Sequence, residues 1–77
     1  MTPEDAIRAM LDRRSAGASI CPSEAARLID ALEWRDHMGQ IRAAAAGMAA
    51  NGEIVVTQKG VAIDIATAHG PIRLARP

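Results

Sequence analysis

The apolar residues change from a helical to an extended spacing at Asn51-Gly52, and this change limits what the chain can fold into. Before it, apolar residues recur at intervals of four and three, as one stripe on a helix requires: Trp34, Met38, Ile41, Ala45 and Met48. After it, two runs rich in β-branched residues flank the tetrapeptide TQKG. The pattern predicts a helix followed by a β-hairpin over residues 53–65.

Two earlier helices are predicted from their start signals. The first opens at TPED, where Thr2 suits the capping position and Pro3 the first helical position. Gly17, in the segment SAGA, is expected to stop it. A short extended piece, SIC, precedes the second helix, CPSEAARLI, whose Cys21 and Glu24 have capping-box spacing.

The third helix is expected to begin between Ala31 and Trp34. Asp30 and Glu33 have capping-box spacing just before it. In the hairpin, Gly60 fits the left-handed position of a type I turn with a bulge. A further turn at Gly70-Pro71 leads into the short extended segment IRL.

The order helix, extended piece, helix, helix, hairpin is that of a winged helix-turn-helix. We therefore expect an α+β fold in which residues 1–77 form a single winged-helix domain. Three helices are followed by a C-terminal β-hairpin wing, residues 53–65, with Lys59 at its tip.

Trp34 is the only aromatic residue, so the core has to be built from Ile, Leu, Val, Met and Ala. Because alanine buries little area, we expect modest stability, to which a partner would add. Trp34 itself is predicted to be the largest core residue, packed where the third helix meets the first two.

Nine Lys and Arg balance nine Asp and Glu, and this zero net charge argues against strong non-specific attraction to nucleic acid. The single cysteine excludes an internal disulfide and fits a reducing cytoplasm. The start MTPED does not resemble a signal peptide, and no stretch has the apolar length of a membrane span. We expect a cytoplasmic protein without a membrane partner.

Five segments together resemble a small bacterial family of winged-helix-like domains whose function is unknown. They are ICPSEAAR, WR at 34–35, IRAAA at 41–45, VTQKG and GPIRL. The resemblance covers nearly the whole chain. It implies a fold and supplies no catalytic residues.

A winged helix that binds duplex nucleic acid would contact it through the third helix and the wing. The candidate contacts are Arg35, Gln40, Arg42, Lys59, Arg73 and Arg76. On the outer side of the third helix, only Gln40 is of a residue type that hydrogen-bonds to base edges, and Asp36 beside it would repel phosphate. Phosphate contact without sequence selectivity, or a small regulator, is therefore the first hypothesis. The alternative interpretation is that these cations are ordinary solvated side chains or pair with acids of the same chain.

The outer side of the third helix carries small residues every four positions: Gly39, Ala43 and Gly47. We call this set the small-residue face. Each glycine lowers helix stability by about 1 kcal/mol relative to alanine in a helix interior, so the presence of two glycines needs an explanation. Contact with a protein partner, a second copy or the C-terminal tail is one interpretation, and a plain exposed helix is the other. A protein-interaction or homodimerisation module is thus the alternative function.

No residue set predicts an enzyme, a metal site or a cofactor. His37 and His69 lack partners at metal-ligand spacing, and Cys21 is best interpreted as a small apolar residue on a buried strand. Neither a nucleophile–histidine–acid set nor a glycine-rich phosphate loop is present.

Overall fold

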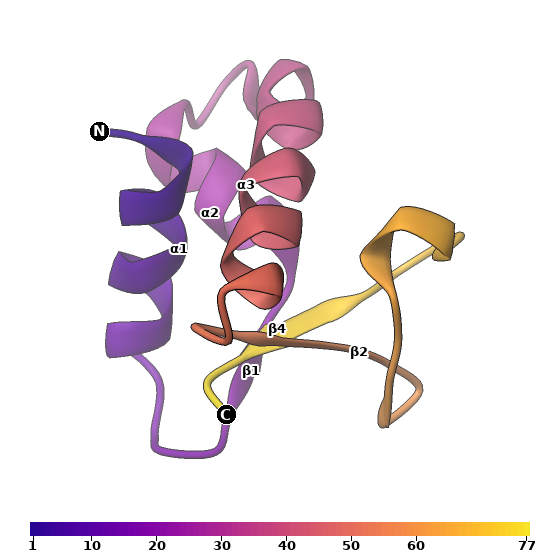
Figure 1. Cartoon of the computed structure of the whole chain (residues 1–77). Helices are drawn as coiled ribbons and strands as arrows, with labels where there is room; N and C mark the ends of the chain where they lie inside the picture. Colours follow the sequence, from indigo (N-terminus) through magenta and orange to yellow (C-terminus); the bar gives the residue numbers. More distant parts are fainter.

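Three α-helices lie on one face of a four-stranded antiparallel sheet in the computed structural model, which describes residues 1–77 (Figure 1). The predicted α+β class and the three helices are confirmed. In chain order the elements are α1 (Pro3–Asp12), β1 (Ser19–Ile20), α2 (Pro22–Ile29), the 3₁₀ turn η1 (Trp34–His37), α3 (Met38–Ala50), β2 (Val55–Gln58), β3 (Val61–Ala62), the 3₁₀ turn η2 (Ile65–Thr67) and β4 (Arg73–Ala75).

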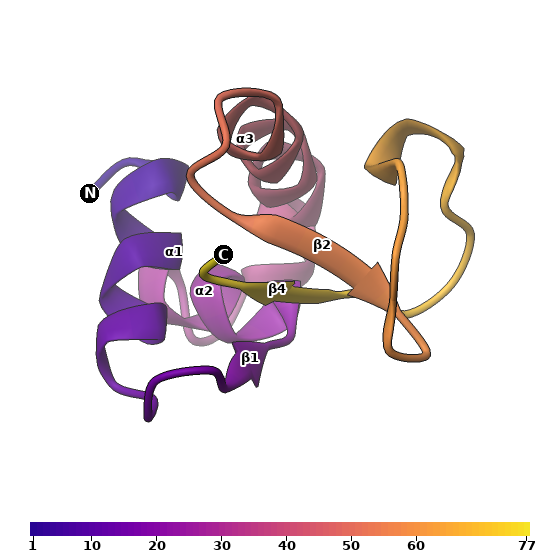
Figure 2. The same cartoon turned by 60° about the horizontal axis from the view of Figure 1, so that its bottom comes forward.

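The last strand of the chain lies inside the sheet, whose strand order is β1-β4-β2-β3 (Figure 2). Leu74 of β4 pairs with Ile20 on one side and with Val56 on the other. All three side chains are buried, so this row forms the floor on which the helices pack. The segment IRL, predicted only as extended, supplies the first two residues of β4, which pairs with both β1 and β2.

Residues 59–71, between β2 and β4, reach outward from the rest of the molecule (Figure 2). We call them the projecting segment and the remainder the body. The antiparallel hairpin predicted over residues 53–65 is confirmed as β2 and β3, but β2 also pairs with β4 inside the sheet, so only the residues after β2 project. The η2 turn contacts α3, and partly buried Ile63, Ile65 and Ala68 pack against the core.

The tip of the hairpin is a two-residue loop. Gln58 pairs with Val61, and the two residues between them both have positive φ, 53° at Lys59 and 80° at Gly60. The left-handed Gly60 is as predicted. The predicted type I turn with a bulge is wrong, because two successive positive φ values are the mark of a type I′ turn.

The predicted caps hold α1 and α2. Thr2 Oγ1 accepts a hydrogen bond from the Asp5 backbone N–H at 3.0 Å. The Cys21 backbone N–H donates to Glu24 Oε2 at 2.7 Å, the acid half of a capping box. Helix α1 ends at Asp12, however, five residues before the glycine expected to stop it; Gly17, with φ 84°, shapes the loop instead.

The third helix begins later than predicted, at Met38. Asp30 Oδ1 accepts hydrogen bonds from the backbone N–H groups of Leu32 and Glu33, at 3.1 and 3.0 Å. These bonds fold the connection into a turn, and Trp34–His37 then form one 3₁₀ turn before α3. The spacing of Asp30 and Glu33 therefore marks a turn and not the start of a helix.

The core is aliphatic, as the composition requires, and contains no buried polar or charged residue. Ile41, Ala45 and Met48 of the predicted stripe are buried. Trp34 is only partly buried and packs at the edge of the core, so its assignment as the largest core residue was wrong. It lies on η1, in the connection between α2 and α3, and not within the packed part of α3.

Candidate functional site

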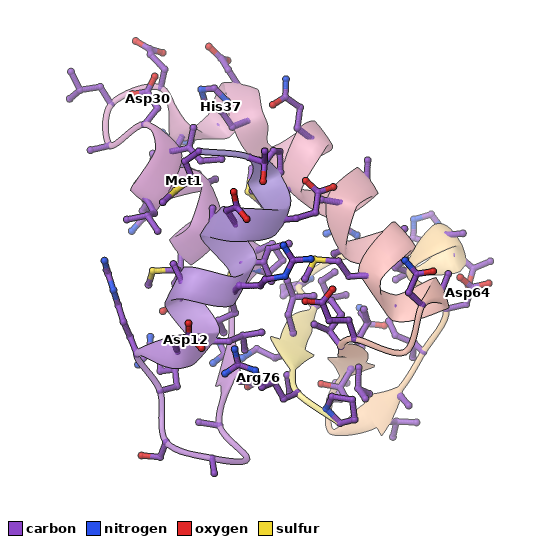
Figure 3. The ribbon with its side chains drawn as sticks, turned by 60° about the vertical axis from the view of Figure 1, so that its left-hand side comes forward. Met1, Asp12, Asp30, His37, Asp64 and Arg76 are labelled. Carbon is purple, nitrogen blue, oxygen red and sulfur yellow. The ribbon has the colours of Figure 1, made fainter.

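Three arginines of the body form ion pairs with carboxylates on other elements or loops. Arg8 Nη2 lies 2.9 Å from Glu53 Oε1, and Arg14 pairs with Glu24. Arg76 Nη2 lies 2.5 Å from Asp12 Oδ1, at the end of α1 where Figure 3 shows the two side chains turned toward each other. Arg76, a predicted nucleic-acid contact, therefore has a carboxylate partner.

Two of these carboxylates have shifted pKa values. The Arg8 guanidinium holds the pKa of Glu53 below its ordinary value through its hydrogen bond. Burial alone would raise the pKa of Glu24, but the Cys21 N–H bond and Arg14 outweigh it and lower that pKa. Glu24 and Glu53 therefore stay ionised below their ordinary pKa. At neutral pH each carboxylate compensates the positive charge of its partner arginine.

The other six cations have no ion pair. They are Arg13, Arg27, Arg35, Arg42, Lys59 and Arg73. Five of them belong to α2, η1, α3 or the residues from Lys59 to the C-terminus. The zero net charge therefore combines ion pairs around α1 with six cations that have no acid partner and five acids that have no Lys or Arg partner.

Two of these cations lie over the indole ring of Trp34. The guanidinium carbon of Arg35 lies 4.3 Å from the centre of the indole ring, and that of Arg27 lies 4.5 Å from it. Sequence reasoning missed Arg27, because the turn between α2 and η1 brings it to Trp34 without any helical spacing. Leu32 in the same turn is 86% exposed.

Lys59 and Arg73 line one cavity of about 560 Å³ at the base of the projecting segment, together with Gln58, His69 and Pro71. No carboxylate lines it. Of the six predicted nucleic-acid contacts, these two are the pair that shares a cavity. The sequence predicts no role for His69, and its place here follows from the turn that returns the chain to β4.

Gln58 and Arg73 give this cavity fixed walls. Gln58 Nε2 donates to the backbone oxygens of His69 and Pro71, at 2.5 and 3.2 Å. Arg73 Nε donates to Ser19 Oγ and its Nη2 to the Ser19 backbone oxygen, both at 2.9 Å. The cation of Arg73 is therefore held by neutral oxygens, which orient it without cancelling its charge.

The small-residue face of α3 is exposed, with Gln40 beside it. No atom lies within 4 Å of the position that a Cβ would occupy at Gly39 or Gly47. Packing of the C-terminal tail on this face, one of the interpretations above, is therefore wrong, because the tail pairs in the sheet as β4. Arg42 on the same helix is partly buried.

His37 and Asp30 meet where α2, η1 and α3 join (Figure 3). His37 Nε2 lies 3.6 Å from Asp30 Oδ2, and the buried His37 Nδ1 has no hydrogen-bond partner. Hydrogen bonds from the Glu33 and Leu32 N–H groups lower the pKa of Asp30, with a smaller contribution from His37. The pair belongs to the turn that fixes the start of α3.

The remaining polar groups make no further cluster. Cys21 is partly buried, and its Sγ accepts a hydrogen bond from Ser23 Oγ at 3.1 Å. No three His, Cys, Asp or Glu side chains gather where they could hold a metal ion. None of the helices has the length and apolar character needed to cross a membrane.

A comparison with curated proteins gave no match. A sequence model of the family described as "Protein of unknown function (DUF3253)" matches residues 2–77, nearly the whole chain. The chain belongs to this family of unknown function.

Proposed function

We propose that the chain is a winged-helix module that binds the backbone of duplex nucleic acid weakly and without sequence selectivity. The order of elements supports the fold assignment: β1 precedes α2, α2 and α3 follow each other across a turn, and β4 returns between β1 and β2. In this arrangement α3 is the recognition helix and the projecting segment, residues 59–71, is the wing.

The observation that carries the proposal is the distribution of unpaired cations. Arg42 on α3, Lys59 at the tip of the β2–β3 loop and Arg73 on β4 have no carboxylate partner, whereas Arg76 is neutralised by Asp12. Cations without acid partners are the groups that replace counterions along a phosphate backbone. We therefore remove Arg76 from the contact set and keep Arg35, Arg42, Lys59 and Arg73.

The exposed side of α3 supports the lack of selectivity. Base edges in the major groove are read by Arg, Lys, Asn or Gln side chains. Among the residues of the exposed side, only Gln40 is of this kind, and the rest are Gly and Ala. A helix with so small a surface approaches the backbone closely but distinguishes few bases.

Fluorescence anisotropy with a labelled duplex tests this function. We expect a dissociation constant in the range of ~10⁻⁴ to 10⁻⁶ M, as for non-specific binding. Four contacting cations at about 0.9 each limit the slope of log K against log salt to about −3.6. Arg42→Gln is expected to weaken binding to every sequence, whereas the matched control Arg13→Gln, at the end of α1, leaves it unchanged. Absence of binding at ~50 mM salt would contradict the proposal.

The small-residue face favours a second candidate, a homodimer. Helix α3 is apolar on nearly all sides, and such helices are usually covered, yet Gly39, Ala43 and Gly47 are exposed. Sedimentation equilibrium of the wild type and of Ala43→Glu tests this candidate. A dimer that Ala43→Glu converts to a monomer supports it, and a wild-type monomer at high concentration contradicts it.

A further inference from the structure

The cavity of Gln58, Lys59, His69, Pro71 and Arg73 has the composition of an anion site. Two of its lining groups, Lys59 and Arg73, carry a permanent positive charge at neutral pH, and no Asp or Glu lines it. The acid closest in sequence, Asp64, uses its Oδ1 to accept the Ala66 N–H at 3.0 Å in the η2 turn. An anion entering the cavity therefore meets two cations and no lining carboxylate.

The cavity is built before any ligand arrives. The Gln58 amide spans from the end of β2 to the carbonyl oxygens of His69 and Pro71, which fixes the separation of its two walls. Lys59 occupies one of the two loop positions with positive φ, so its backbone has little freedom. The guanidinium of Arg73 is held by Ser19, and a binding group held in place in this way loses little entropy when a ligand binds.

Arg73 keeps donors available for a ligand. A guanidinium has five N–H groups, and Ser19 accepts two hydrogen bonds, one from Nε and one from Nη2. Both Nη1 hydrogens and one Nη2 hydrogen are left without a protein acceptor. Paired N–H groups of arginine match the oxygens of phosphate, for which Arg is a favoured partner.

We infer that this cavity, at the base of the projecting segment, binds a phosphate-bearing small ligand through Arg73 and Lys59. Its volume of about 560 Å³ lies within the roughly 300–1,000 Å³ of small-molecule sites. That is more room than one phosphate group needs, so a sugar or nucleoside attached to the phosphate can enter with it. The inference does not rest on binding of duplex nucleic acid.

Titration of the folded chain with inorganic phosphate, followed by two-dimensional amide NMR, tests the inference. The expected result is a saturable shift of amide signals confined to residues 58–60 and 69–73, absent when sodium chloride gives the same ionic strength. A parallel titration with AMP distinguishes the sources of the phosphate. Tighter binding of AMP assigns the cavity to a nucleotide, and equal binding assigns it to free phosphate. No saturation by ~10 mM phosphate, weaker than millimolar affinity, overturns the inference.

Two variants identify the groups that bind. Lys59→Asn removes the charge and keeps a residue type that tolerates positive φ; Arg73→Gln removes the guanidinium. Each is expected to weaken phosphate binding about tenfold or more, since hydrogen bonds to charged groups have that magnitude. Arg13→Gln is the matched control and leaves the affinity unchanged. If Arg73→Gln fails to fold, Lys59→Asn alone decides, and unchanged affinity of that variant overturns the inference.

Arg42→Gln separates this site from the proposed function. Arg42 lies on α3 and does not line the cavity. It is expected to weaken duplex binding and to leave phosphate and AMP binding intact. Phosphate binding without duplex binding rejects the proposed function alone, and duplex binding without saturable phosphate shifts rejects the cavity alone.

Discussion

The body and the projecting segment use their cations in different ways. In the body, Arg8, Arg14 and Arg76 each pair with a carboxylate that lies at least ten residues away in the chain. In and beside the projecting segment, Lys59 has no partner and Arg73 donates only to neutral oxygens of Ser19. A chain with no net charge therefore contains three arginines paired with acids, all in the body, and six cations without an acid partner, of which Lys59 and Arg73 lie in and beside the projecting segment.

This difference shows why net charge is a weak guide to what a small domain binds. The body pairs join α1 to the loop after α3 and to the C-terminal residues, and the loop after α1 to α2, so their charge connects elements. Exposed pairs of this kind add little stability. Their larger effect is to make Arg8, Arg14 and Arg76 less available than an unpaired cation to any anionic ligand.

The largest expected difference between the two regions is in stability. Leu74→Ala, in the middle of the body sheet, should lower the free energy of unfolding by about 2–5 kcal/mol, because the side chain is fully buried. Val61→Ala, in the projecting segment and 64% exposed, should change it by no more than about 0.5 kcal/mol. Urea unfolding of both variants measures this. Equal losses would show that the projecting segment is part of the cooperative core.

The loop between β2 and β3 should give a smaller effect. Gly60→Ala is expected to cost about 1–2 kcal/mol, since φ is 80° and no atom lies within 4 Å of the added Cβ, so the loss is backbone strain alone. Gly39→Ala, in α3 with equally open space, is the matched control and should stabilise by about 0.5–1 kcal/mol. Thermal unfolding of the pair compares them, and the same sign for both would refute the assigned turn.

The smallest effect is expected from the ion pairs of the body in acid. Glu24 and Glu53 have lowered pKa values in the folded protein, so their stabilising contribution is complete above the ordinary value of 4.5 and is lost as the pH falls below it. Urea unfolding between pH 7 and pH 3 should therefore show decreasing stability below about pH 4.5.

Glu53→Gln tests the source of this acid sensitivity. The variant should be less stable than wild type at neutral pH and should lose less stability on acidification, because it no longer pairs with Arg8 as a carboxylate. Lys59→Asn, in the projecting segment, should keep the wild-type pH dependence. A Glu53→Gln curve parallel to wild type would mean that the pair contributes nothing to folding.

The features that sequence predicted depend on local signals. Thr2 with Pro3, and Cys21 with Glu24, are caps formed within three residues, and both helices begin where these signals place them. The left-handed conformation of Gly60 is likewise a local preference of glycine. The turn after Asp30 shows the limit of such signals, because the same carboxylate spacing fits a helix start and a loop.

The features that sequence reasoning missed depend on contacts between distant residues. Gln58 and Arg73 line the same cavity only because β4 pairs between β1 and β2. No local sequence pattern predicts that pairing. The stacking of Arg27 on Trp34 likewise follows from the path of one turn. Charge pairing is equally non-local, and so the carboxylate partner of Arg76 was not anticipated.

The position of Trp34 has a consequence for spectroscopy. It is the only aromatic residue of the chain, so near-ultraviolet absorption and intrinsic fluorescence originate almost entirely from the corner between α2 and α3. Two guanidinium groups stacked on the ring make its emission sensitive to any loosening of that corner. The residues that line the cavity of the projecting segment carry no chromophore, so an opening of that segment would not change absorption or fluorescence.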